Sequence, residues 1–359
     1  MGEATKPRLL IRVAAIAFVL AMLFIAAEVG ASLLLVYRER LKRHDCDLLS
    51  SVLVFKKSAA KLGWTDYGSA QFDAESPGLI FDDDVLGWSL VPGEHTVVFK
   101  HRGCQEIEWE RFPTKTTING DHSRWTGLQF DPSKPTIYIF GDSFVEGWGV
   151  NDEQTFAYYL QMALQRYNVK LFAAPGYNLV HTYLRFQQLK ANIRPDDILI
   201  IGYADFYDAR NVAAPSELRE LETWMNTRVA EEKNRKLGKT PKAEIGKDGS
   251  LTISLVDRDC RIVVDYCRKT DPSQSYMTIV SAKLINEIAR ETNAKIYLLH
   301  IDGLKINTLF QQLDNNVTTI SALQDDFGFF IRDTVEYFDP HPGPYWHYAI
   351  SRKLLSQIQ

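Results

Sequence analysis

The sequence predicts an α/β protein with a central parallel sheet covered by helices on both faces, preceded by one membrane-spanning helix. From about residue 135 onward, short β-branched and aromatic runs alternate with amphipathic stretches, a pattern typical of parallel sheets. An apolar stretch within residues 9–37 is long enough to cross a bilayer. The first strand ends in Gly-Asp-Ser just before a helix, which places a serine where open α/β sheets bind their ligands.

The elements of the sheet region follow its hydrophobic pattern. The expected elements are strand 137–140, helix 153–166, strand 169–173, helix 180–192, strand 197–203, helix 276–292, strand 295–300, a last strand near 329–332 and helix 345–357. The alternation breaks between about 213 and 275, where a charged helical stretch, three glycines and a strand-like run at 251–256 follow one another. We expect an insertion there, lying over one side of the sheet.

The segment Thr136 to Gly149, TIYIFGDSFVEGWG, is the most specific motif of the chain. Gly141 permits a sharp turn after the strand, and the start of a helix favours negative charge nearby. The order of strand, GDSF, Gly-Trp-Gly and helix resembles the nucleophile block of the SGNH/GDSL hydrolases, in the form of their membrane-anchored bacterial branch. The resemblance implies a flavodoxin-like three-layer sandwich, with Ser143 as nucleophile and Asp142 as a supporting residue. The alternative is a tight strand-to-helix turn with a capping serine.

A second motif, Asp-Pro-His-Pro at residues 339–342, lies on a proline-rich loop before the last helix. An imidazole can take the serine proton, and a carboxylate two residues away can fix its orientation. The segment resembles the last block of the same family, which implies Asp339 and His341 as triad members and His347 as a supporting residue. Gly343 and Trp346 depart from the family pattern, and a proline-rich turn with a surface histidine is the alternative.

The blocks that form the oxyanion hole in this family are degenerate here. Residues 174–177, Ala-Pro-Gly-Tyr, resemble the second block and imply that the N–H groups of Gly176 and Ser143 bind the oxyanion. That block normally begins with a polar residue, which is Leu171 in this chain.

The third block, Gly-x-Asn-Asp in the family, reads Gly-Tyr-Ala-Asp at residues 202–205, so Ala204 stands where the donor side chain is expected. Losing one donor costs roughly 10²- to 10³-fold in rate. The nearest replacement donors in the sequence are Asn178, Tyr203 and Asn211, while Asp205 retains the polar end of the block.

The N-terminal region predicts a single-pass anchor. The apolar run from Val13 to Ala27 resumes after Glu28 and is preceded by three basic residues, so residues 1–8 are expected in the cytoplasm and residues 9–37 in the bilayer. The C-terminal part would then be periplasmic, at a bacterial inner membrane. A cleaved signal peptide is the alternative, because residues 29–31, Val-Gly-Ala, form an acceptable cleavage site. Glu28 is either a carboxyl near the interface or a contact to another membrane protein.

The remaining chain divides into a lead-in region at 45–130, packed on the sheet, and a hydrolase-like domain at 131–359. Its four cysteines suggest disulfides in an exported domain, namely a local Cys260–Cys267 bridge across a strand-like stretch and a Cys46–Cys104 bridge. Four unpaired thiols are the alternative. No cysteine or histidine spacing predicts a metal site, and no cofactor is expected. A formal charge of −4 gives no argument for nucleic-acid binding.

Two functional hypotheses follow. The first is a membrane-anchored serine hydrolase or acyltransferase that acts on an ester, with O-acyl or O-acetyl groups of an envelope glycan or lipid as the substrate that the resemblance implies. The second is a weak or inactive module of the same fold that serves as a subunit of a membrane assembly, which the degenerate blocks and Glu28 favour.

Overall fold

Five parallel strands form the central sheet of the structure, a computed structural model. It describes residues 22, 71–75, 78–102, 108–219, 238–303, 308–327, 334–336 and 339–358. The strand order β7-β6-β8-β11-β12 corresponds to 2-1-3-4-5 along the chain, which is the flavodoxin-like order. The strands are β6 (Thr136–Gly141), β7 (Asn168–Ala173), β8 (Ile198–Ala204), β11 (Lys295–Asp302) and β12 (Val317–Ser321). The predicted α/β class with a central parallel sheet is confirmed.

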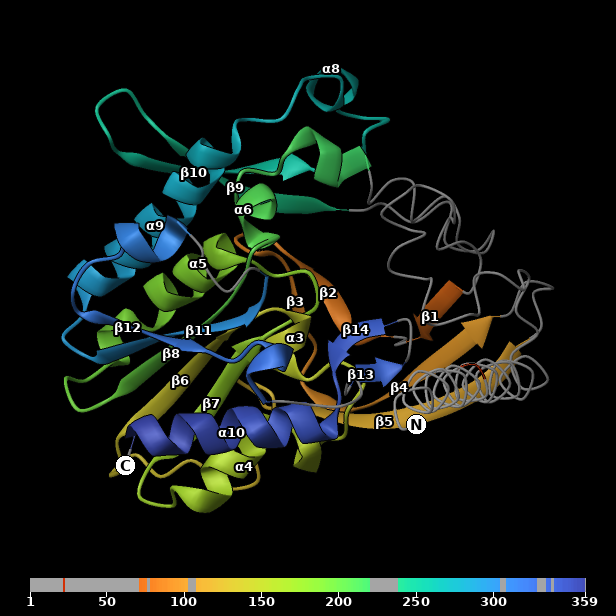
Figure 1. The fold of residues 1–359 in the computed structure, drawn as a ribbon, viewed down its shortest axis with the longest axis vertical. Coiled ribbons are helices and arrows are strands. Elements are labelled where there is room, and N and C mark those ends of the chain that lie inside the picture. Colours follow the sequence, from red (N-terminus) through yellow and green to blue (C-terminus); the bar gives the residue numbers. More distant parts are fainter. Residues whose placement is uncertain are drawn as a thin grey trace, which may run out of the picture. The chain divides into compact units, whose positions relative to one another are not determined.

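Helices cover both faces of this sheet (Figure 1). One face carries α4 (Phe156–Ala163) and α10 (Pro344–Ile358), and the other carries α5 (Leu179–Leu189), α6 (Tyr207–Asn211) and α9 (Gln274–Glu291). Side chains alternate across a strand, so Ile137 and Ile139 of β6 join the α4–α10 core, whereas Tyr138 and Phe140 join the α5–α9 core. The sheet is therefore buried on both faces, as its nearly continuous apolar strands require.

Two elements of the sheet region differ from the sequence expectation. The helix expected from residue 153 begins at Phe156, after the 3-10 turn η1 (Asp152–Gln154), because the Thr155 side chain caps it by accepting the Tyr158 N–H. The fifth strand is β12, which the hydrophobic pattern missed because Ile320 is its one fully buried residue. The strand expected near 329–332 lies outside the described residues.

The described part of the insertion contains an antiparallel hairpin, β9 (Lys239–Ile245) and β10 (Leu251–Asp257). Ala243 of this hairpin joins the core formed by α5 and α9, so the insertion packs on that side of the sheet. The predicted Cys260–Cys267 disulfide is present, with the Cα atoms 5.7 Å apart. The strand expected between the two cysteines is wrong, because the bridged segment forms a turn followed by α8 (Val264–Cys267). Cys46 and Cys104 lie outside the described residues.

The chain divides into two units, residues 1–75 with 99–112 and residues 76–98 with 113–359. The first unit contains β1 (Gln71–Glu75) and the adjoining ends of β4 (Gly93–Arg102) and β5 (Glu108–Ile118), in a sheet of order β1-β4-β5. The second contains the central sheet, the β9–β10 hairpin and two further antiparallel pairs, β2 (Ile80–Asp83) with β3 (Gly87–Leu90) and β13 (Thr334–Glu336) with β14 (Asp339–Pro342). The other short elements are α3 (Ser143–Glu146), η2 (Lys190–Asn192), η3 (Thr308–Gln312) and η4 (Gln324–Phe327).

The predicted anchor at 9–37 falls outside the described residues except for Met22. Within the part of the chain that the structure describes, no helix has the length and apolar character needed to span a membrane.

Candidate functional site

Ser143 and His341 meet at the carboxyl end of β6, although they are 198 residues apart in the chain. Ser143 is the first residue of α3 and is buried, while His341 lies on β14. The distance from His341 Nε2 to Ser143 Oγ is 2.7 Å, which suits proton transfer from a nucleophilic hydroxyl to a base. The imidazole also packs against Phe144, with ring centroids 4.8 Å apart. The structure thus brings the predicted nucleophile and base together.

Asp339, the third predicted member of the triad, begins β14, and its backbone pairs with Glu336 of β13. Its side chain lies outside the part of the chain that the structure describes. Its assignment as the residue that orients His341 remains a prediction.

Two glycines allow α3 to sit close to the sheet. A Cβ atom on Gly141 or on Gly202 would lie 2.2 Å from Cγ2 of Val145, so neither position accepts a larger residue without displacing the helix. Gly141 does not have a positive φ. The sharp turn expected at this glycine is therefore not what requires it, since a side chain here would collide with Val145.

Asp142 caps the helix that begins at Ser143. Its Oδ1 accepts the Phe144 N–H at 3.0 Å, and its own N–H donates to the Tyr207 hydroxyl at 3.0 Å. Burial raises the pKa of the Asp142 carboxyl, and its Oδ2 has no hydrogen-bond partner among the described residues. Asp142 therefore caps the helix that begins at Ser143 and joins it to Tyr207 of α6.

The loop that contains Gly176 follows β7, whose last residue, Ala173, pairs with Gly141 of β6. Gly176 has a φ of +80°, and a Cβ there would lie 3.2 Å from the ring of Trp88. Trp88 also donates from Nε1 to the Pro175 carbonyl at 3.0 Å. A second hydrogen bond joins Trp88 to this loop, since the Tyr177 hydroxyl donates to the Trp88 carbonyl at 2.7 Å. A tryptophan of the lead-in region thus holds the predicted oxyanion loop at the same sheet edge as Ser143.

The three side chains considered as replacement oxyanion donors are engaged inside the fold. Asn178 caps α5, and its Nδ2 donates to the Arg210 carbonyl at 3.0 Å. The Tyr203 hydroxyl donates to Asp208 at 3.0 Å, and Asn211 Nδ2 donates to Ser281 Oγ at 2.9 Å. Their donor groups therefore serve helix capping and buried polar contacts, and the structure does not bring them to Ser143.

The degenerate positions of these blocks are apolar core positions. Leu171 is buried in the α4–α10 core, and Ala204 is buried in the α5–α9 core. Asp205, the next residue, accepts a hydrogen bond from His300 Nε2 at 3.0 Å. This pair has no third ligand, since the described residues contain no group of three His, Cys, Asp or Glu side chains that is placed to hold a metal.

His347 is buried beneath the site, on α10. Its Nδ1 accepts the Phe156 N–H at 3.3 Å, and its ring stacks on Phe156 with centroids 5.8 Å apart. Burial, reinforced by the nearby positive charges of Arg124 and His341, lowers the pKa of His347 to about 3. His347 is therefore neutral at pH 7 and is placed to join α10 to α4.

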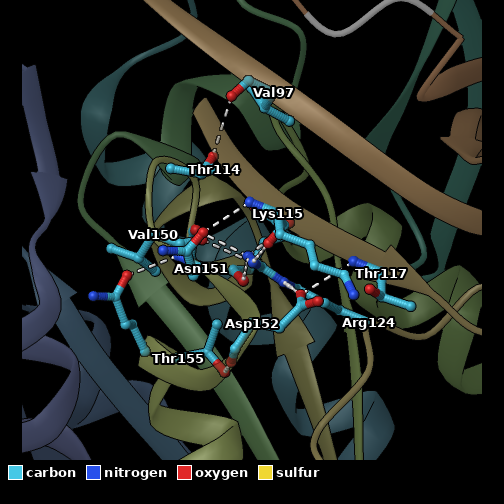
Figure 2. A network of polar contacts seen from close by, with 12 residues as sticks. Val97, Thr114, Lys115, Thr117, Arg124, Val150, Asn151, Asp152 and Thr155 are labelled. Carbon is cyan, nitrogen blue, oxygen red and sulfur yellow. Dashed lines mark hydrogen bonds and ion pairs between the residues drawn. The ribbon is translucent and has the colours of Figure 1, made fainter. Parts of the chain in front are cut away.

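Arg124 is the main residue near this site that sequence reasoning missed. Its fully buried guanidinium donates to the carbonyls of Glu146, Gly147 and Val150 at 2.8 to 2.9 Å and to that of Lys115 at 3.2 Å (Figure 2). It also pairs with two buried carboxylates, Glu146 at 3.1 Å and Asp152 at 3.0 Å. Arg124 therefore fixes the segment that directly follows α3, the helix that begins at Ser143.

A signal for this arginine was present in the sequence. Glu146 directly follows the apolar residues Phe144 and Val145 of the serine block, and an acid that is buried with such residues requires a cationic or hydrogen-bonding partner. The pattern did not show which arginine supplies it.

No family model matches the chain, and no curated protein matches it. Among solved structures, a member of the lipolytic protein G-D-S-L family from Veillonella parvula DSM 2008 is 10% identical, with a TM-score of 0.36, over 62% of this chain and 97% of that chain. The psychrotrophic esterase EstA from Pseudoalteromonas sp. is 12% identical, with a TM-score of 0.35, over 63% and 97%. A catalytic mutant of Axe2, an acetylxylan esterase from Geobacillus stearothermophilus, is 11% identical, with a TM-score of 0.36, over 62% and 94%. At these TM-scores the likenesses carry no argument about this chain, and its fold class rests on its own strand order.

Proposed function

We propose that the protein is a serine ester hydrolase or acyltransferase of the SGNH type. The observation that carries the proposal is the 2.7 Å contact between Ser143 Oγ and His341 Nε2, at the carboxyl edge of a parallel sheet. The contact joins the two sequence blocks that resemble this family, and a serine bonded to a histidine is the arrangement that activates a hydroxyl for attack.

In the proposed reaction, Ser143 Oγ attacks the ester carbonyl carbon and its proton passes to His341 Nε2. The N–H groups of Ser143 and Gly176 hold the oxyanion, and Asp339 orients the imidazole from its other side. Collapse of the intermediate breaks the bond to the alcohol, which leaves with the proton from His341. Water in hydrolysis, or a second alcohol in acyl transfer, then attacks the acyl carbon and gives its proton to His341 Nε2. The bond from that carbon to Ser143 Oγ breaks, and His341 returns the proton to the serine oxygen.

We also propose a cellular location and a substrate class for this activity. The apolar stretch at 9–37 would anchor the chain in a bacterial inner membrane with the sheet domain in the periplasm. The substrate would then be an ester of the cell envelope, such as an O-acyl or O-acetyl group on a glycan or lipid. The disulfide between Cys260 and Cys267 supports an oxidising compartment.

A second candidate function is a non-catalytic subunit of a membrane assembly. The observation that favours it is the burial of Ala204 in the apolar core where the family carries a donor side chain, with Asn178, Tyr203 and Asn211 engaged elsewhere. A missing donor lowers the rate by roughly 10²- to 10³-fold. An enzyme can remain active after such a loss, whereas the function of a structural subunit does not depend on the donor.

Hydrolysis of p-nitrophenyl acetate by the full-length chain in detergent separates the two functions. We expect turnover by the wild-type protein, loss of that turnover in Ser143→Ala and in His341→Gln, and no change in the exposed control Ser356→Ala. A folded wild-type protein whose rate equals that of Ser143→Ala would favour the structural subunit.

A further inference from the structure

We propose that Glu146, held by Arg124, is a second carboxylate that acts on His341 and stabilises the imidazolium ion formed when Ser143 attacks. Glu146 would be a positioning residue, since it acts through His341 and does not touch the substrate. The inference rests on the proposed function and deepens it, because it assigns part of the electrostatic stabilisation of the imidazolium ion to a residue outside the predicted triad.

The position of Glu146 follows from the short helix α3. Glu146 lies three residues after Ser143, and residues at this spacing share one side of a helix, with Cβ atoms about 5–6 Å apart. His341 is bonded to Ser143, and its strand β14 contacts α3. Glu146 therefore lies on the same short helix as the serine that His341 contacts, and the electrostatic influence of His341 is among those that act on its carboxyl.

The charge of the buried cluster is not balanced. Glu146 and Asp152 share one cation, Arg124, and all three side chains are almost completely inaccessible. Arg124 binds Oε1 of Glu146, whereas Oε2 has no hydrogen-bond partner among the described residues. When both carboxyls are ionised, the two carboxylates and the single guanidinium leave a net negative charge, which any cation that forms nearby stabilises.

Arg124 also determines whether Glu146 is ionised and where it points. Burial raises the pKa of the Glu146 carboxyl, and the positive charge of Arg124 opposes that rise. Through its bonds to the carbonyls of Glu146 and Gly147, the same guanidinium fixes the backbone that carries this side chain. A Cβ on Gly147 would lie 3.1 Å from Arg124 Nη1, so the glycine permits this approach.

Other charged or titratable groups surround His341, and any pH dependence must account for them. Asp142 directly precedes Ser143, and Tyr207 and Arg210 of α6 are among the groups that interact with its carboxyl. His347 faces it from α10 and is neutral at pH 7, and Asp339 lies on its own strand. Glu146 differs from these groups in combining an ion pair with Arg124 and a buried oxygen, Oε2, that has no hydrogen-bond partner among the described residues.

The test compares Glu146→Gln with the exposed control Glu153→Gln. The isosteric change keeps the acceptor for Arg124 and removes the charge. We expect the acid limb of the kcat/KM profile on an aryl ester to move about one to two pH units lower. The plateau of kcat should fall about tenfold with KM unchanged, because the imidazolium loses its stabilisation. The control should leave both quantities unchanged.

A second readout keeps the inference distinct from the proposed function. In a Ser143→Ala background, NMR titration of the His341 ring should show its midpoint lowered by a similar amount when Glu146 is changed to Gln. An unmoved midpoint in folded protein would overturn the inference even if ester hydrolysis is robust, and a lowered midpoint would support it even if no ester is hydrolysed.

Should Glu146→Gln fail to fold, Asp152→Asn supplies the same test. It removes the other negative charge of the cluster while keeping an acceptor for Arg124 Nε and for the Thr117 N–H, both of which now bond Asp152 Oδ1. The His341 midpoint should again move lower, by less than in the Glu146 variant. A midpoint that stays in place or rises would overturn the inference.

Discussion

Acidification should destabilise the protein through His347, and His347→Gln should remove that sensitivity. In the folded protein the ring is buried, and its pKa is lowered from 6.5 to about 3. In the unfolded chain it protonates near its ordinary pKa. Between these values the unfolded state binds more protons, so the folded state loses stability as the pH falls below about 6.5 and the loss is complete near pH 3.

The size of this effect follows from the difference of about 3.5 units between the two pKa values. Since one pKa unit corresponds to roughly 1 kcal/mol or slightly more, the total loss approaches about 5 kcal/mol, of which about half falls between pH 7 and pH 4.5. The glutamine side chain of the variant would offer the Phe156 N–H an amide oxygen without a proton to gain. Urea denaturation of the full-length chain at both pH values measures the difference, with His95→Gln, a partly exposed histidine, as the control.

The wild-type protein should lose about 2–3 kcal/mol more than His347→Gln between the two pH values. Equal losses in the two proteins would refute the reasoning, because they would mean that His347 takes up its proton in the folded state as readily as in the unfolded chain.

Three further changes test other parts of the structure. Trp88→Phe removes the hydrogen bond to the Pro175 carbonyl beside Gly176 and should lower kcat about tenfold with little change in KM; an unchanged kcat in steady-state kinetics would mean that Trp88 does not hold the oxyanion loop. Replacing both Cys260 and Cys267 with Ser opens a loop with a sequence separation of 7 and should cost about 2.5 kcal/mol in urea denaturation, whereas an unaltered midpoint would show that the bridge adds nothing. Ala204→Asn places an amide in the apolar core and should cost about 1–3 kcal/mol without raising ester turnover, and a gain in turnover would show that the new amide reaches the oxyanion.

The strands and helices that the sequence predicted well are those with long, regular apolar patterns. The runs that became β6, β8 and β11 are buried on both faces, so their composition alone identifies them. The edge strand β12 has two exposed threonines and a single fully buried residue, and such a run resembles a loop. Residues 262–264, Ile-Val-Val, predicted a strand from their β-branched side chains, but the nearby disulfide closes the segment into a turn and a helix.

The sequence predicted those site residues that lie in a recognisable motif and carry reactive side chains. It did not predict the residues whose position depends on packing between distant parts of the chain. Ser143 and His341 lie in recognisable blocks, and the structure brings them into contact. Asn178 and Asn211 looked like available donors because sequence spacing does not reveal that helix capping and core contacts already engage them. Arg124, in a polar segment that resembles a surface turn, is fully buried only because carbonyl groups from several distant residues converge on it.

The most direct test of the central claim is covalent labelling of the full-length chain with a fluorophosphonate, followed by mass spectrometry of its peptides. Because His341 Nε2 lies 2.7 Å from Ser143 Oγ, the serine should be activated for attack on phosphorus. We expect one modified peptide, the one that contains Ser143, and no labelling in Ser143→Ala or His341→Gln. Absence of label on folded wild-type protein, or label that persists in Ser143→Ala, would contradict it.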